Sequence, residues 1–156
     1  MKRAVIAGVL AALLGSGSAY GYWSTAGTGT GAATSGTALA LTLSPGTPTS
    51  QLFPGSTADV AMTIANPNTF MVRVSSLSLD TTQGNGGFAV DASHSACGLG
   101  ALSFTTQTNS GNGWDVPAAG SLFVRLNSSL AMATSAANTC QGATFTIYLG
   151  TAGSAP

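Results

Sequence analysis

Few side chains in this sequence are able to do acid–base or nucleophilic chemistry. The one histidine, His94, lies in the stretch DASHSAC, with Asp91 three residues before it and serines on both sides. A Ser–His–Asp arrangement needs a nucleophile, a base and an orienting acid that the fold brings together. No Gly-x-Ser-x-Gly turn of the kind that presents a nucleophile accompanies them. We therefore expect His94 to be a loop histidine, and we expect no catalytic residues.

Metal-binding side chains are equally sparse. Asp80, Asn85 and Asp91 bracket a glycine-rich loop, and oxygen ligands on a flexible loop could hold calcium. The regular spacing of a calcium loop is absent, however, and aspartate in turns commonly accepts hydrogen bonds from the turn itself. We expect neither a metal site nor a cofactor.

The composition excludes several classes of function. The 156 residues include four Lys and Arg, four Asp and Glu, and no Glu at all, so that only 5% are charged. A typical soluble domain carries roughly 25% charged residues. These counts exclude a basic nucleic-acid binder, a charge-rich coiled coil and an enzyme that needs several acids, bases or nitrogen ligands.

The first 21 residues have the layout of a secretory signal peptide. Lys2 and Arg3 precede an apolar run from Ala4 to Leu14, and small residues follow it. The run is about half of the roughly 20 apolar residues that span a bilayer, although an uncleaved anchor is the alternative. We expect cleavage after Ala19 or Gly21, and a secreted, extracellular or cell-surface location.

Two cysteines remain in the exported chain, Cys97 and Cys140. An even number of cysteines in a secreted protein indicates a disulfide. Two ligands without a nearby cluster cannot complete a zinc site, which makes metal binding the weaker alternative. We expect a Cys97–Cys140 disulfide, which the chain-entropy model values at about 4 kcal/mol.

The rest of the chain divides into a lead and one domain. Residues 22–37 are a low-complexity run of Gly, Thr, Ser and Ala, which predicts a flexible lead. From residue 38 to 156, apolar residues alternate in short runs separated by turn residues, with no amphipathic helix. This pattern predicts an all-β fold, an antiparallel β-sandwich of seven or eight strands that is immunoglobulin-like or jelly-roll-like. The apolar runs lie at 39–43, 58–64, 70–79, 88–90, 102–106, 114–116, 122–126 and 144–149.

One strand of this domain contains a change of phase. Val72 and Val74 lie on even positions, whereas Leu77 and Leu79 lie on odd ones. A regular strand would turn one of these pairs away from the core. A bulge at Ser75–Ser76 would restore the apolar face, and a strand that crosses between sheets is the alternative.

Four aromatic residues are candidates for interaction: Tyr20, Tyr22, Trp23 and Trp114. We expect Trp114 to lie in a loop and to cap one end of the sandwich, or to stack on a sugar ring. The first three precede or open the flexible lead, so they have no core of their own. We expect them to dock onto a sheet of the same chain or of a neighbour.

Two stretches resemble known families. The N-terminus GSGSAYGYWSTAGTGTG, through Ala19-Tyr20 or Gly21-Tyr22-Trp23-Ser24, resembles the signal and mature start of the camelysin/TasA group of exported bacterial proteins. That resemblance implies a jelly-roll-like sandwich that builds fibres, in which an N-terminal segment adds as a strand to the next subunit. Some members have been called metalloproteases, but one His and no Glu cannot form an HExxH site.

The stretches LFPGSTADVAMTIANPNTFMVRVSSLSL, DVPAAGSLFVRL and QGATFTIYL resemble bacterial immunoglobulin-like domains, and the whole chain resembles small secreted actinobacterial β-sandwich proteins of unassigned function. We expect a non-catalytic structural or surface protein that self-assembles by strand addition. Its partners would be copies of itself or cell-surface components, with no nucleic acid, and with a membrane only transiently through the signal segment. The alternative is a module that binds extracellular or cell-wall polysaccharide through Trp114.

Overall fold

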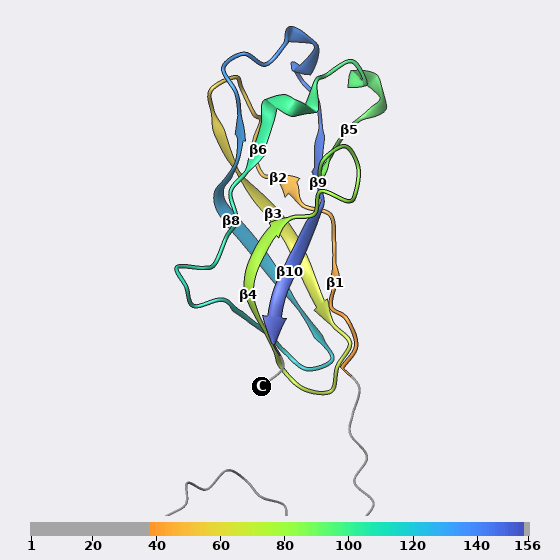
Figure 1. Ribbon diagram of the computed structural model, residues 1–156, viewed down its shortest axis with the longest axis vertical. Coiled ribbons are helices and arrows are strands. Elements are labelled where there is room, and N and C mark those ends of the chain that lie inside the picture. The colour runs from red at the N-terminus through yellow and green to blue at the C-terminus, as the bar shows by residue number, and fades with distance from the viewer. Residues whose placement is uncertain (1–37, 155–156) are drawn as a thin grey trace, which may run out of the picture. The chain divides into compact units, whose positions relative to one another are not determined.

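The computed structural model describes residues 38–154, and the expected signal peptide (1–21) and lead (22–37) lie outside them. The described residues form ten β-strands and three 3-10 helices, with no α-helix among them (Figure 1). The strands are β1 (Thr42–Leu43), β2 (Thr47–Pro48), β3 (Thr57–Asn66), β4 (Val72–Leu79), β5 (Phe88–Val90), β6 (Leu102–Phe104), β7 (Trp114–Val116), β8 (Gly120–Met132), β9 (Phe145–Ile147) and β10 (Leu149–Ser154). The 3-10 helices are η1 (Ala92–His94), η2 (Leu99–Ala101) and η3 (Asn138–Cys140).

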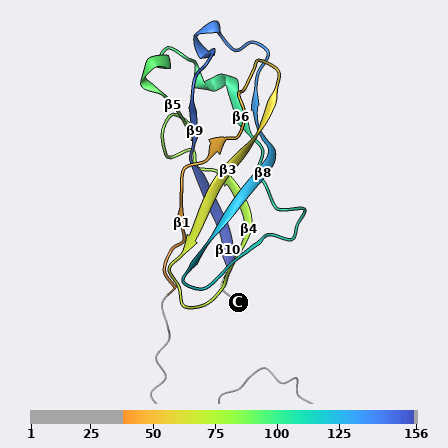
Figure 2. The ribbon, with the colours of Figure 1, turned by 180° about the vertical axis from the view of Figure 1, so that it is seen from behind.

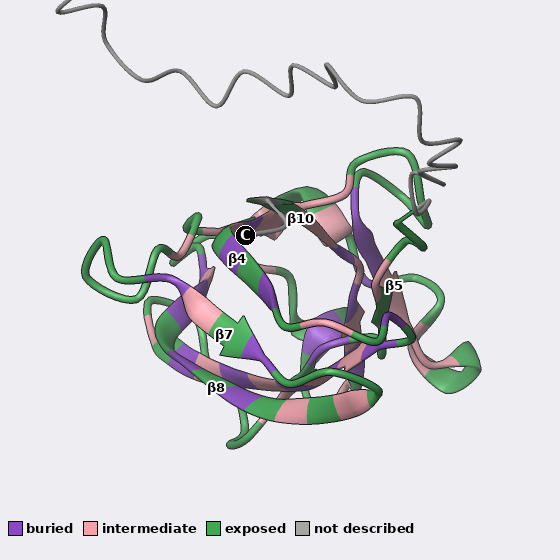
Figure 3. Cartoon of the chain, turned by 90° about the horizontal axis from the view of Figure 1, so that it is seen from below, coloured by how far each residue is buried: buried purple, intermediate pink, exposed green. Residues whose placement is uncertain are grey.

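All strand pairs are antiparallel, which confirms the all-β prediction. One sheet has the order β1-β3-β8-β6, with β2 also paired to β3, a second has the order β10-β4-β7, and β5 pairs with β9. Seen from below, β10, β4, β7 and β8 curve around the core (Figure 3). The predicted count of seven or eight strands is wrong. The structure adds β2, and it divides the last apolar run at Tyr148, where the chain changes partner from β5 to β4.

The core follows from alternation along the two longest strands. In β3 the residues Ala58, Val60, Met62 and Ile64 are buried, and the residues between them are partly exposed. Across the sheet, β8 places Val124 opposite Met62, so that buried side chains of both strands share one face. The period of two therefore sets which face of the sheet meets the core.

The phase change in β4 is a β-bulge, which is the first of the two alternatives that the sequence left open. Ala152 of β10 lies opposite Ser76, but the next residue, Gly153, lies opposite Val74, so Ser75 is the extra residue. Val74 and Leu77 are both fully buried on either side of it. The inserted residue restores the apolar face, as the sequence pattern requires.

The strand expected from the apolar run at 122–126 is longer than that run. β8 continues to Met132 through a bulge, because Val60 pairs with Leu126 whereas Ala58 pairs with Leu130. The Asp59 carboxylate accepts hydrogen bonds from the Ser128 N–H at 2.7 Å and from Arg125 Nε at 2.8 Å. The bond from Ser128, followed by that from Arg125, lowers the pKa of the Asp59 carboxyl.

Two buried asparagines fix the point at which the described chain enters the domain. Asn66 Nδ2 donates to the Phe70 carbonyl at 2.8 Å and to the carbonyls of Val116 and Pro117 at 3.2 and 3.0 Å, so it joins the turn after β3 to the end of β7. Asn68 Nδ2 donates to the Leu39 carbonyl at 2.9 Å, and the Leu39 N–H donates to Asn68 Oδ1 at 2.7 Å. The strand predicted at 39–43 is therefore a tethered extended segment, of which only Thr42–Leu43 pairs with β3.

Candidate functional site

The Asp91–His94 pair ties together two loops. His94 Nδ1 lies 2.8 Å from Asp91 Oδ1, and since a carboxylate only accepts hydrogen bonds, Nδ1 is the donor. The same carboxylate accepts from the Ser93 hydroxyl and from the Thr144 N–H, the latter at 2.7 Å. These three contacts, that of Ser93 foremost, lower the pKa of Asp91 well below its usual range. Asp91 therefore caps η1 and holds it against the start of β9.

Ser93 does not complete a Ser–His–Asp triad with this pair. Ser93 lies on the Nδ1 side of the His94 ring, at 3.2 Å. On that side the Nδ1–H already donates a hydrogen bond to Asp91. The other ring nitrogen faces Gly142, because a Cβ added to that glycine would lie 3.8 Å from it. A Ser–His–Asp triad needs its serine on the nitrogen that the acid leaves free.

The two aspartates considered for calcium binding, Asp80 and Asp91, each accept hydrogen bonds within a different turn. Asp80 accepts hydrogen bonds from the Thr82 hydroxyl at 2.6 Å and from Gln83 Nε2 at 2.7 Å, and these bonds lower the pKa of its carboxyl. Asp91 is occupied at η1, as described above. In the part of the chain that the structure covers, no three His, Cys, Asp or Glu side chains gather as a metal cluster.

Cys97 and Cys140 form the predicted disulfide. Their sulfur atoms are 2.04 Å apart, and both residues are buried. The bond joins the loop after η1 to η3, in a part of the domain where strands are short. A disulfide is compatible with an extracellular location. Within residues 38–154, no helix has the length and hydropathy needed to cross a bilayer.

The structure places Trp114 in a strand rather than in the predicted loop. Trp114 is the first residue of β7, pairs with Val74 of β4, and packs partly buried against the core. The preceding glycine, Gly113, has a φ of +67° and approaches the Val74 carbonyl too closely for a Cβ. This tight turn brings the ring onto the sheet. Tyr20, Tyr22 and Trp23, the other predicted interaction residues, lie outside the described residues.

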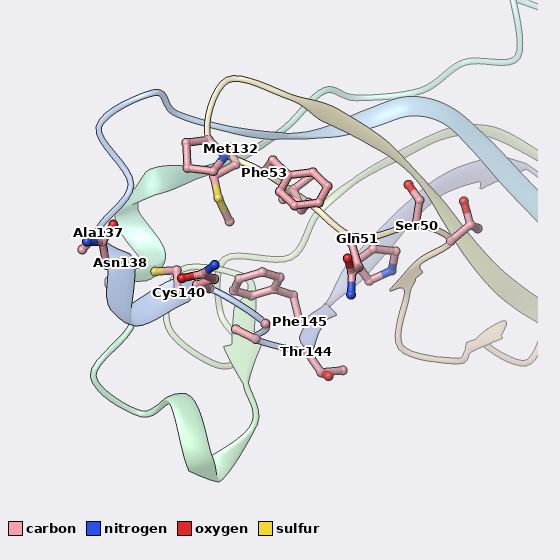
Figure 4. Close-up of a pocket in the computed structure, with 16 residues that line it drawn as sticks. Ser50, Gln51, Phe53, Met132, Ala137, Asn138, Cys140, Thr144 and Phe145 are labelled. Carbon is pink, nitrogen blue, oxygen red and sulfur yellow. The ribbon is translucent and has the colours of Figure 1, made fainter.

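A cleft of about 790 Å³ lies between two loops at the end of the domain that carries the disulfide. One wall is the segment 48–54 between β2 and β3, and the other is the segment 137–145 around η3. Figure 4 shows Phe53, Met132 and Phe145 near one another, with Gln51 beside the two rings. Phe145 is buried, whereas Phe53 is 60% exposed. The cleft therefore has an apolar floor and an aromatic ring at its rim.

The outer edge of β10 is the second candidate site. Thr151 lies opposite Leu77, whose N–H and C=O both bond to Gln107 on the far side of β4. At such a position of an antiparallel pair, both residues turn their backbone groups away from each other. The N–H and C=O of Thr151 therefore face away from β4, where no other described residue pairs with them.

This open edge begins where β1 and β10 diverge. Gly46 and Ile147 exchange two backbone hydrogen bonds, at 2.7 and 2.9 Å. On one side of this pair, β1 pairs with β3 and β10 pairs with β4, so β1 and β10 belong to different sheets. Because backbone direction alternates along a strand, Leu149 and Thr151 face the same side as Ile147. The open edge thus runs from this pair to the end of β10.

The other sheet edges of the described domain are shorter or carry blocking residues. β1 and β2 have two residues each, separated by Pro45, and β2 contains Pro48. β7 has three residues, and its Asp115 pairs with Arg73 at 3.3 Å. β10 has six residues, none of them charged or proline. Short strands, charges and prolines are the usual protection of an edge against pairing with another chain.

Comparison with known proteins adds no relative. No model of a known family matches the chain, and searches of curated proteins and of solved structures return no similar protein. The geometry of the cleft and of the β10 edge is therefore the basis for assigning a function.

Sequence reasoning missed the residues of the cleft. Gln51 and Asn138 are far apart in the chain, and neither belongs to a recognisable motif. Only Phe53 could have been predicted from the sequence. Pro54-Gly55 is typical of a turn, and a large aromatic residue directly before a turn is expected to be exposed.

Proposed function

We propose that the protein is an exported, non-catalytic structural protein of the cell surface that assembles with copies of itself by strand addition. The acceptor is the outer edge of β10, and the donor is the N-terminal segment that carries Tyr22 and Trp23. The observation that carries this proposal is the backbone of Thr151, which faces away from β4 without a described partner. Backbone hydrogen bonds supply affinity in strand addition, and alternate side chains supply register.

The composition of β10 supports the same proposal. Its residues LGTAGS are small apart from Leu149, so an added strand meets little steric obstruction. The described domain carries two arginines against four aspartates, a formal charge of −2, which gives weak self-repulsion. Other proteins usually protect an uncharged edge strand of this length against pairing with another chain.

The position of the chain entry supports the N-terminal segment as the donor. Asn68 holds the backbone of Leu39 by two hydrogen bonds. The start of the described chain and the end of β10 lie at the same end of the domain (Figures 1 and 2). The segment that precedes Leu39 therefore leaves the domain at the same end as the acceptor edge of β10.

The finer parts of this proposal rest on the sequence. The signal-peptide layout of residues 1–21 supports export, and the buried disulfide is consistent with it. The resemblance of the N-terminus to the camelysin/TasA group supports a jelly-roll-like sandwich that assembles into fibres.

The decisive experiment compares two substitutions of Thr151 in residues 20–156, with the disulfide intact. Thr151→Pro removes the outward N–H without breaking a bond to β4, and proline is tolerated on an edge strand at such a position. Thr151→Val keeps the N–H and nearly the same shape. We expect the valine variant to polymerise like the unmodified chain in light scattering and negative-stain microscopy, and the proline variant to remain monomeric.

A second variant tests the donor. A chain that starts at Ala38 retains the whole described domain but lacks the proposed donor segment, and we expect it to stay monomeric at every concentration. Far-UV circular dichroism and the urea midpoint of each monomer establish that the domain is folded. Equal polymerisation of the proline variant, or of the shortened chain, would contradict the strand-addition mechanism.

A further inference from the structure

We propose that the cleft between segments 48–54 and 137–145 binds a neutral oligosaccharide, with Phe53 stacking on a sugar ring. This inference is independent of the strand-addition proposal, because the cleft shares no residue with β10. Its volume of about 790 Å³ falls within the range of roughly 300–1,000 Å³ found for small-molecule sites. The alternative of polysaccharide binding thus moves from Trp114, which packs on the core, to a different aromatic residue.

Phe53 is held by a preordered turn. The Ser56 N–H donates to the Phe53 carbonyl at 2.9 Å, and the Ser56 hydroxyl bonds to both the Phe53 N–H and its carbonyl, at 2.8 and 2.7 Å. Gly55, with a φ of +79°, donates its N–H to Met132 of β8 at 2.9 Å. The backbone of the turn is therefore fixed before any ligand arrives, so that only the Phe53 side chain, in a residue that is 60% exposed, has to be ordered on binding.

Uncharged polar residues also line the cleft. The side-chain amides of Gln51, Asn138 and Gln141 line the cleft, and they form no hydrogen bond to another described residue. The hydroxyls of Ser50 and Thr144 line it as well. Amides and hydroxyls both donate and accept, which matches the hydroxyl groups of a sugar. The apolar face of a pyranose ring matches the exposed face of a phenylalanine.

The absence of charged residues in the cleft disfavours phosphate and carboxylate ligands. No lining residue carries a charge, and Cys140 is held in the disulfide. Arg125 Nη2 lies 3.5 Å from the hydroxyl of Thr49 at the edge of the cleft, but Arg125 Nε already donates to the Asp59 carboxylate at 2.8 Å. A phosphate or carboxylate ligand would lose water here without gaining a charged partner, which is unfavourable. A neutral polyhydroxylated ligand avoids this cost.

The test measures binding of neutral hexasaccharides to residues 20–156 by titration calorimetry and by chemical-shift changes. The probes are cellohexaose, maltohexaose, mannohexaose and chitohexaose, beside a galacturonate oligosaccharide and an uncharged Ser/Thr-rich peptide as comparisons. We expect at least one neutral hexasaccharide to bind, and Phe53→Ala to weaken that binding at least about tenfold. Phe53→Trp should retain it, because the larger ring keeps the stacking surface.

Phe123→Ala is the matched control. Phe123 is 68% exposed on the outer face of the sheet formed by β3 and β8, away from the cleft, so its loss should leave the affinity unchanged. The proposal is overturned if no neutral hexasaccharide binds, or if Phe53→Ala and Phe123→Ala have equal effects. Tighter binding of the galacturonate oligosaccharide, or binding of the peptide alone, would overturn it as well.

Discussion

Removal of the disulfide tests how the disulfide-bearing end of the domain is held together. Cys97 and Cys140 are separated by 43 positions, and a closed loop of this size restricts the unfolded chain by about 4 kcal/mol in the chain-entropy model. The segments on either side of the bond contain short strands and 3-10 helices, which contribute little pairing of their own. We therefore expect the double variant Cys97→Ala/Cys140→Ala to lose about 4 kcal/mol of unfolding free energy.

The assay is urea unfolding followed by circular dichroism and by tryptophan fluorescence. Coincident transitions from the two probes establish two-state behaviour, without which a single free energy has no meaning. Both cysteines are buried, so the alanine variant also loses the packing of two sulfur atoms. The unmodified chain in the presence of a reductant keeps these atoms and loses only the bond, which makes it the appropriate control.

The expected result is a large loss in both forms, with the larger loss in the alanine variant because it also lacks the two buried sulfur atoms. If the variant and the reduced chain each lose less than about 1 kcal/mol, the constraint on the unfolded chain is not what stabilises this domain, and the chain-entropy reasoning fails. A loss confined to the alanine variant would assign the effect to packing instead.

Two further predictions concern single residues. Gly87 has a φ of +94°, and a Cβ there would lie 2.4 Å from Leu79 Cγ, whereas a Cβ at Gly86 would meet no atom within 4 Å. Gly87→Ala should therefore lower the melting temperature more than Gly86→Ala. The pKa of Asp59 is lowered in the fold from an ordinary value of 3.8, so its carboxylate stabilises the fold above about pH 4 and loses this effect as the pH falls further. Asp59→Asn should therefore be less stable than the unmodified chain at pH 7, and the two urea midpoints should converge near pH 2; a constant gap would refute this reasoning.

Alternation and phase were sufficient to predict much of the fold. The period of two along 58–64 predicted β3 and its buried face, and the phase change between Val74 and Leu77 predicted either a bulge at Ser75–Ser76 or a crossing between sheets, of which the structure has the bulge. Both predictions depend only on side chains within one strand and on the requirement that apolar residues face the core. The disulfide followed from the number of cysteines in a chain expected to be exported.

The failures came from contacts between distant residues. Asn127-Ser128-Ser129 has the composition of a loop, yet it lies inside β8, because Asp59 on the neighbouring strand accepts the Ser128 N–H. Trp114 follows a run of loop residues, yet it pairs with Val74. In each case a single partner from another part of the chain decides between loop and strand, and no local pattern records that partner.

The cleft could not be predicted for a related reason. Its walls come from segments at 48–54 and 137–145, which meet because β3 pairs with β8 and because Cys140 is bonded to Cys97. Glutamine, asparagine and phenylalanine are ordinary residues when taken one at a time. Their significance lies in their convergence on one space without a charged neighbour, which is a property of the fold.

The charged groups of the described domain lead to a last prediction, about salt. Every Arg, Asp and His side chain of the described domain is already engaged within it: Arg73 with Asp115, Arg125 with Asp59, His94 with Asp91, and Asp80 with Thr82 and Gln83. Contacts with a partner or ligand are thereby left to backbone groups, amides, hydroxyls and apolar surface. Such contacts are not screened by ions, whereas charge–charge contacts at a surface weaken as salt rises. Self-assembly and oligosaccharide binding should therefore both change less than about twofold between 50 mM and 500 mM NaCl, measured by light scattering and by calorimetry. A tenfold loss of either over this range would mean that a charge pair carries the contact, which neither the β10 edge nor the cleft can supply.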